Sequence, residues 1–235
     1  MRICLWSGPR NVSTALMYSF AQRADCEVAD EPLYAHYLRI SGADHPGREE
    51  VLEVMDDNGD RVMRGLVDGP ASAPVLFMKH MAHHLVDLDL SFLQRTANIL
   101  LIRDPQDMLP SLTRQLPQAQ LADTGLARQH RLLDELRKIG QQPPVIDAAR
   151  LVGDPKTMLA ALCARLNLGF DAAMLHWPPG PRSYDGPWAR HWYDNVHRST
   201  GFAAPSSTRD PFPEHLRPLL ETCRPHYDYL RDYAL

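Results

Sequence analysis

Residues 3–14 read ICLWSGPRNVST, a short apolar run that leads through a loop into a segment of helical character. The run Ile3–Trp6, bounded by turn residues, is typical of a buried parallel strand. A helix that starts directly after such a loop offers unpaired backbone N–H groups and a positive dipole end to a phosphate-like anion. Ser13 and Thr14 add hydroxyl donors, and Arg10 adds a planar cation. The stretch therefore predicts an anion site, with an ordinary strand–helix turn as the alternative.

The same pattern of strand and helix continues along the chain. Four further apolar runs predict strands, and they are Cys26–Ala29, Val75–Met78, Asn98–Ile102 and Val145–Asp147. Helical spacing is found in Ser13–Arg23, Gly47–Asp56, Asp123–Ile139, Asp154–Leu166 and Glu214–Tyr233, the last with expected breaks near Pro218 and Pro225. This alternation predicts an α/β fold in which a doubly wound parallel sheet lies between two helical layers. Ligands bind such sheets at the carboxyl ends of the strands.

We expect one domain over residues 1–235, in which the last sixty or so residues form an irregular cover over the sheet. Residues 206–211 are expected to form an exposed loop.

Composition narrows the class of protein. A net charge of −4 argues against a general nucleic-acid binder, which usually carries a basic face. The four cysteines are far apart and predict reduced thiols, not a zinc site or a disulfide framework. The sequence has no apolar run long enough to predict a membrane span, and the N-terminal apolar run is too short for a signal peptide. A cytoplasmic location is therefore expected. The first loop ends in Ser13-Thr14-Ala15 and lacks the lysine of a triphosphate-binding loop.

A second segment, after the fourth predicted strand, also suggests an anion site. Arg103 stands at the strand tip, Asp104 can cap a helix that Pro105 opens, and Ser111 follows two helical turns later. An arginine at this edge is costly to bury unless an anion meets it. The alternative is an ion pair between Arg103 and a nearby carboxylate such as Asp104 or Asp107.

Together the two segments resemble the sulfotransferase family, whose donor is 3'-phosphoadenosine 5'-phosphosulfate. Pro9–Thr14 is similar to the family loop Pro-[Arg/Lys]-Ser-Gly-[Ser/Thr]-Thr, which cradles the 5'-phosphosulfate. Arg103–Ser111 matches Arg-[Asn/Asp]-Pro-x-Asp-x-x-x-Ser, whose arginine and serine hold the 3'-phosphate. Asp154–Gly169 is similar to a third family segment, which extends the resemblance over roughly residues 1–175. Val12 stands in place of the family glycine, so Asn11 is expected to adopt the unusual φ of the turn.

The resemblance implies a P-loop NTPase-like sheet and an enzyme that transfers a sulfuryl group to a hydroxyl or amine of a small-molecule or carbohydrate acceptor. Its product would be adenosine 3',5'-bisphosphate, and no metal is required. The expected nucleotide-binding residues are Arg10, Asn11, Ser13, Thr14, Arg103, Ser111, Trp188 and Arg190, of which Arg10 also meets the bridging oxygen. The last two belong to an aromatic segment that could instead be a structural clasp. A non-catalytic nucleotide binder and, less favoured, a P-loop kinase remain alternatives.

Two places can supply the catalytic base. In several sulfotransferase groups a Glu-Pro after the second strand carries the catalytic carboxylate, and Glu31-Pro32 stands there. Other groups place Lys-x-His after the third strand, where this chain has Lys79-His80 without the intervening residue. The histidine candidate is therefore His80, with His83 and His84 as neighbouring registers. The acceptor is expected near residues 34–67.

Overall fold

The computed structural model describes residues 1–70, 72–203 and 211–235, and in this part of the chain five parallel strands form one sheet. The strands are β1 (Arg2–Ser7), β2 (Cys26–Asp30), β3 (Val75–Met81), β4 (Ala97–Ile102) and β5 (Val145–Asp147), in the order β2-β3-β1-β4-β5. Each strand contains one of the five predicted apolar runs, so the prediction of a parallel α/β sheet is confirmed.

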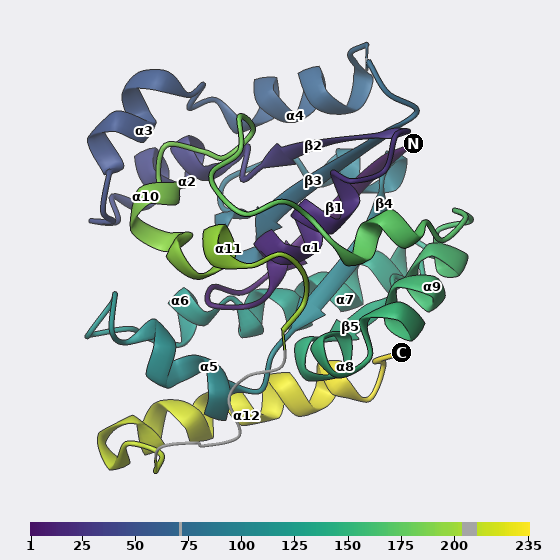
Figure 1. Cartoon of the computed structure of the whole chain (residues 1–235). Coiled ribbons are helices and arrows are strands. Elements are labelled where there is room, and N and C mark those ends of the chain that lie inside the picture. Colours follow the sequence, from purple (N-terminus) through teal and green to yellow (C-terminus); the bar gives the residue numbers. More distant parts are fainter. Residues whose placement is uncertain (71, 204–210) are drawn as a thin grey trace.

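Helices cover both faces of this sheet (Figure 1), as expected for a doubly wound three-layer fold. One face carries α1 (Ser13–Phe20), α8 (Ala148–Gly153) and α9 (Pro155–Arg165). The other carries α4 (Gly59–Asp68), α5 (Pro105–Leu112), α7 (Leu126–Lys138) and α12 (Arg217–Arg231). The described residues also form the helices α2 (Tyr34–Ser41), α3 (Arg48–Val54), α6 (Leu121–Thr124), α10 (Ala189–Trp192) and α11 (Asp194–Arg198). Short 3-10 turns lie at Ala82–His84, Leu90–Arg95, Ala172–Leu175 and Glu214–Leu216.

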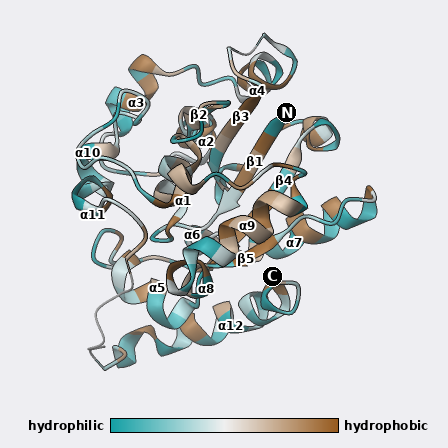
Figure 2. Cartoon of the chain, turned by 45° about the vertical axis from the view of Figure 1, so that its right-hand side comes forward, coloured by the Kyte–Doolittle hydropathy of each residue, from teal (hydrophilic) through white to brown (hydrophobic). Residues whose placement is uncertain are grey.

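The central strands β1, β3 and β4 are largely apolar on both sides because both of their faces are buried. Successive residues of β1 alternate, so that Ile3 and Leu5 pack under α1 and α9 while Cys4 and Trp6 pack under α5 and α7. β1 and β3 are correspondingly hydrophobic along most of their length (Figure 2). This alternation also decides which side chains at the strand tips face a ligand.

β1 lies at the point where the chain reverses direction across the sheet. After β1 the chain builds β2 and β3 on one side, and then crosses to build β4 and β5 on the other. A crevice forms at the carboxyl end of the strands at such a switch point. The first loop therefore lies where the fold itself favours ligand binding.

Some helix boundaries differ from the expected ones. The helix predicted over Asp123–Ile139 is split at Gly125, whose φ of 73° ends α6 and begins α7. The predicted break near Pro225 is wrong, because α12 continues through this residue, and Pro218 lies in the first turn, where no helical N–H is needed. The expected loop over 206–211 falls almost wholly outside the described residues.

The cover formed by residues 176–203 lies beside α2 and α3 (Figure 1). Trp188, Ala189 and Tyr193 bury their side chains against Tyr34 and Leu38 in a separate apolar cluster. The cover therefore closes one side of the crevice at the strand tips.

Candidate active site

A cavity of about 340 Å³ lies at the carboxyl ends of the strands. Its walls come from the loop and first turn after β1 (residues 9–15), from Glu31 after β2, from Lys79 and Met81 of β3, and from Arg103 after β4. The cover adds residues between 188 and 203. The residues singled out after three different strands thus line one cavity.

The loop after β1 is held in shape by Asn11 and by a strained arginine. The Asn11 amide donates to the Leu101 carbonyl of β4 (3.0 Å), and its side-chain oxygen accepts from the Val12 N–H (2.9 Å). The unusual φ belongs to Arg10 (53°) and not to Asn11, which corrects the expectation. Asn11 is used to tie the loop to the sheet, while Arg10 bears the left-handed conformation that a glycine would adopt more easily.

The N-terminus of α1 opens into this cavity. Its N-cap, Val12, provides no side-chain hydrogen bond, and Ser13, Thr14 and Ala15 line the cavity wall. The first-turn N–H groups of the helix are therefore available to a ligand, together with two hydroxyls. Such an arrangement favours an anion.

Arg10, Arg103 and Ser111 meet beside the helix N-terminus. Arg103 Nη1 donates to the Arg10 carbonyl (2.6 Å), and Arg10 Nε donates to Ser111 Oγ (2.9 Å). Burial first, and then the nearby charges of Arg103 and Arg114, lower the pKa of Arg10. The structure thus brings together the two predicted anion-binding segments, and the crowding of positive charge favours a bound anion.

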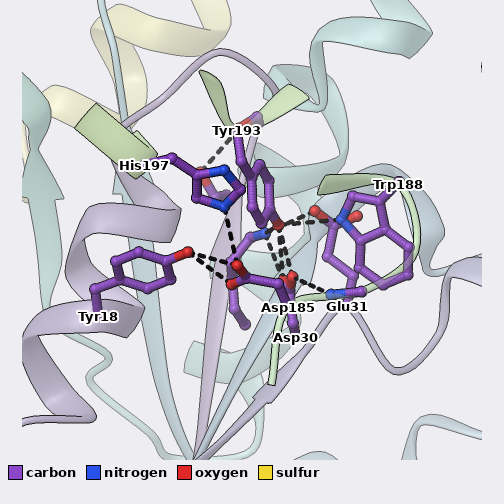
Figure 3. A network of polar contacts seen from close by, with 11 residues as sticks. Tyr18, Asp30, Glu31, Asp185, Trp188, Tyr193 and His197 are labelled. Carbon is purple, nitrogen blue, oxygen red and sulfur yellow. Dashed lines mark hydrogen bonds and ion pairs between the residues drawn. The ribbon is translucent and has the colours of Figure 1, made fainter. Parts of the chain in front are cut away.

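On the opposite wall, the carboxylates of Asp30 and Glu31 lie near the Tyr193 hydroxyl (Figure 3), and both accept from one lysine. Lys79 Nζ donates to Asp30 Oδ1 and to Glu31 Oε1, each at 2.7 Å, and it also bonds the Tyr193 hydroxyl. Lys79 is only 1% exposed. Glu31 has a φ of 40°, a conformation that turns the chain directly after β2.

The environment of Glu31 suits a proton acceptor. Burial raises the pKa of this carboxyl, the Lys79 ammonium opposes the rise, and the charge of Asp30 adds to it. A carboxylate with a raised pKa that remains ionised near neutrality accepts a proton more effectively than an ordinary surface carboxylate.

The structure places His80 away from the cavity, so the expectation of His80 as a base is corrected. Lys79 and His80 are successive strand residues and point to opposite faces of the sheet. The His80 ring stacks on Trp6 at a centroid distance of 4.4 Å. Burial, aided by the charge of Lys79, lowers the pKa of His80 to about 3. A neutral ring under the helical layer cannot reach an acceptor in the cavity.

His83 and His84 do line the cavity, at an end rich in aromatic rings. His84 stacks against Tyr34 and Tyr37, with centroids 4.9 and 4.6 Å apart. Within the described ranges, the Nδ1 atoms of both histidines are buried without a hydrogen-bond partner. Burial lowers the pKa of His83 to about 3 and that of His84 well below its usual value, so both rings are neutral. Among the described residues no group of histidine, cysteine, aspartate or glutamate side chains is arranged to hold a metal.

The two nucleotide-binding candidates in the cover have different surroundings. Trp188 borders the cavity but is 1% exposed, and its ring meets Tyr34 edge-on at 5.0 Å, as in the structural clasp considered above. Its Nε1 donates to the Tyr193 hydroxyl (3.1 Å). Arg190 does not line the cavity, because its exposed guanidinium pairs with Glu50 on α3, so its predicted place in the site is wrong.

Two residues that the sequence did not assign now belong to the site. Lys79 could have been found from its place in an otherwise apolar strand. Tyr193 had no comparable signal, since its charged partners Lys79 and Asp30 lie 114 and 163 residues away in the sequence.

No helix in the described part of the chain has the length and apolar character needed to cross a membrane.

Comparison with known proteins identifies the family. The sulfotransferase domain family matches residues 1–234. Branched-chain-amino-acid aminotransferase-like protein 1 of Arabidopsis thaliana is 42% identical over 230 residues, which cover 97% of this chain and 41% of that protein. The chain thus spans about two fifths of the length of this relative.

Two solved structures share the fold at 16% identity. The sulfotransferase domain from the curacin biosynthetic pathway superposes with a TM-score of 0.58 over 94% of this chain and 96% of its own. The sulfotransferase from Alicyclobacillus acidocaldarius gives a TM-score of 0.54 over 97% of this chain and 94% of its own. With the family match over nearly the whole sequence, these findings show that the chain belongs to the sulfotransferase domain family, a family of transferases.

Proposed function

We propose that this chain transfers a sulfuryl group from 3'-phosphoadenosine 5'-phosphosulfate to a hydroxyl or amine of a small-molecule or carbohydrate acceptor. The observation that carries the proposal is that Arg10 and Arg103 line one cavity beside the open N-terminus of α1, where Arg103 donates to the Arg10 carbonyl and Arg10 donates to Ser111. A donor with two separate anionic groups matches these two adjoining anion-binding features. A nucleotide triphosphate lacks a matching partner, because the loop has no lysine.

In this proposal the 5'-phosphosulfate lies at the N-terminus of α1, where Ser13, Thr14 and Arg10 donate to it. The 3'-phosphate lies against Arg103 and Ser111. As the bond between sulfur and the bridging oxygen breaks, negative charge grows on the leaving phosphate. The helix N–H groups and the Arg10 guanidinium stabilise this charge without rearrangement, because the loop is already tied to β4.

Glu31 is the base in this proposal. The acceptor oxygen or nitrogen forms a bond to sulfur and its proton passes to the Glu31 carboxylate, while adenosine 3',5'-bisphosphate leaves with the electron pair of the broken bond. Glu31 lines the same cavity as the α1 N-terminus, whereas the His80 ring stacks on Trp6 outside the cavity lining.

The acceptor end is proposed to lie among Tyr34, His45, His83 and His84. The Tyr34 hydroxyl bonds His45 Nδ1 (2.9 Å), while the Nδ1 atoms of His83 and His84, which have no hydrogen-bond partner among the described residues, offer hydrogen bonds to an acceptor. Burial lowers the pKa of His45, and the nearby charge of Asp123 opposes this fall. Burial also lowers the pKa values of His83 and His84, so the three imidazoles are neutral near pH 7. A polar, uncharged acceptor fits this lining better than an anionic one.

Nucleotide binding tests the donor assignment. Calorimetric titration should show tighter binding of adenosine 3',5'-bisphosphate than of ATP or 5'-AMP. Arg103→Ala should weaken bisphosphate binding by about tenfold to a hundredfold, since it removes a charged hydrogen-bond donor, and should affect 5'-AMP less. Arg190→Ala is the matched control, because this arginine pairs with Glu50 outside the cavity. Tighter binding of ATP than of the bisphosphate would contradict the proposal.

Transfer of radioactive sulfate from the donor to a pool of small hydroxyl and amine compounds tests catalysis. Glu31→Gln should bind the nucleotide and lose most of the transfer. A parent protein that binds the bisphosphate but transfers nothing to any acceptor in such pools would favour the alternative, a nucleotide binder of the same fold without catalytic activity.

A further inference from the structure

The Tyr193 hydroxyl occupies the centre of the carboxylate network in Figure 3. It donates to the Asp30 carboxylate, whose oxygens lie 2.7 and 2.9 Å away, and it accepts from Trp188 Nε1 at 3.1 Å. It also accepts from Lys79 Nζ. The residue is 5% exposed and lines the cavity wall. A hydroxyl with one donor and two acceptor positions is thereby fully used.

The charges around this hydroxyl are unequal in number. One ammonium, that of Lys79, faces two carboxylates, those of Asp30 and Glu31, and all three side chains are buried. The three N–H groups of Lys79 are all engaged, by Asp30, Glu31 and Tyr193. The cover supplies two further donors to Asp30, namely the Tyr193 hydroxyl and the backbone N–H of Gly186 at 3.2 Å. Among the described residues Asp30 and Glu31 form no ion pair with a second cation, and these donors stabilise the second negative charge.

We propose that Tyr193 is a positioning residue, which holds the Lys79 ammonium between Asp30 and Glu31 and so keeps Glu31 anionic for proton transfer. This inference rests on the proposed function in assigning Glu31 as the base. It extends that function, because it makes the cover formed by residues 176–203 a part of the catalytic machinery that tunes the base through Lys79 and Asp30.

The groups that face Glu31 come from four elements. They are Lys79 of β3, Asp30 of β2, Tyr34 of α2 and Tyr193 after α10. Burial and the charge of Asp30 raise the pKa of Glu31, whereas Lys79 and the Tyr193 hydroxyl lower it. Loss of the Tyr193 hydroxyl and loss of the Asp30 charge are therefore expected to move the titration of Glu31 in opposite directions.

The test compares Tyr193→Phe and Asp30→Asn with the parent. Protein labelled with ¹³C at the glutamate side-chain carboxyl is titrated by NMR, and the Glu31 signal is assigned by its loss in Glu31→Gln. Tyr193→Phe should move the Glu31 midpoint upward by about one pH unit, and Asp30→Asn should move it downward. The acid limb of the pH profile of kcat for sulfuryl transfer should move with each midpoint. Tyr229→Phe, a tyrosine on α12 that bonds Asp134, is the control and should shift neither.

The readouts separate this inference from the proposed function. An unchanged or lowered Glu31 midpoint in Tyr193→Phe, in a variant whose thermal melt and bisphosphate affinity match the parent, would overturn the inference. If Tyr193→Phe does not fold, an Asp30→Asn midpoint equal to or above that of the parent would overturn it as well. Midpoints that move as expected in a parent without any transfer activity would support the charge role of Tyr193 while refuting the enzyme assignment.

Discussion

Replacement of Lys79 by methionine gives a direct measure of how strongly the carboxylate network depends on its one cation. Lys79 is 1% exposed and lies 2.7 Å from an oxygen of Asp30 and 2.7 Å from one of Glu31. Methionine preserves much of the volume and removes the charge, which leaves two buried carboxylates without a cation in the network. Breaking a buried ion pair from one side typically costs about 3–5 kcal/mol. For a chain of this size, that corresponds to a melting temperature lower by about 6–20 °C.

The loss should depend on pH in a defined direction. Burial raises the pKa of Glu31, and loss of the Lys79 ammonium removes the charge that opposes this rise. The folded-state pKa of Glu31 in the variant therefore lies above its unfolded value of about 4, so stability of the variant falls as pH rises through this interval. In the parent, the neighbouring carboxylates raise the pKa of Lys79 despite its burial. Its stabilising contribution is therefore fully present below the unfolded pKa of about 10.4 and stays constant across this range. The deficit should consequently be smaller near pH 5 than near pH 7.5.

Calorimetric melts of parent and Lys79→Met at these two pH values provide the assay. Lys138→Met, at an exposed position in the last turn of α7, is the matched control and should melt close to the parent. Addition of Asp30→Asn to Lys79→Met should recover part of the loss, since one of the two buried charges is then gone. A variant that melts within about 2 °C of the parent, or a deficit that is equal at both pH values, would refute the electrostatic account of this network.

Two further predictions concern the elements that hold the site. Gly8→Ala should lower the free energy of unfolding by about 1–3 kcal/mol, because the new Cβ would overlap the backbone oxygen of the last residue in α6. Chemical denaturation measures this loss, and Gly153→Ala is the control, because a Cβ there meets no atom within 4 Å. Equal losses in the two variants would contradict the prediction. Tyr227→Phe should cost about 1–2 kcal/mol, since it removes the hydroxyl that donates to Asp147 at 2.6 Å at the end of β5; unchanged denaturation midpoints would show that this bond contributes little.

The strands could be predicted because a buried parallel strand leaves a continuous apolar run in the sequence, and each of the five runs lies in a strand. The ends of the helices were harder to predict from the sequence. Whether Pro225 breaks α12 depends on the packing of its turn against α5 and α7, which local sequence does not reveal. The split at Gly125 likewise depends on the close approach of α6 to the first loop, since a Cβ at Gly125 would lie 3.3 Å from Gly8.

Part of the candidate site was also accessible from sequence. The convergence of Arg10 and Arg103 followed from the rule that strand tips share one edge of a parallel sheet. His80 was misplaced because the choice between neighbouring side chains depends on the phase of the strand, and that phase directs Lys79 toward the cavity. Tyr193 could not be predicted, because its contacts depend on how the cover folds back across the strand tips.

The bond from Arg103 to the Arg10 carbonyl has a consequence for selectivity among ligands. It joins the Arg103 side chain at the tip of β4 to the Arg10 carbonyl in the loop after β1. The distance between the two proposed anion-binding places is therefore held by this bond. In the proposed function, the site therefore selects ligands by the spacing between their two negative groups as well as by their charge. Adenosine bisphosphates that carry the same charge with the second phosphate at the 2' position should be distinguished by geometry alone.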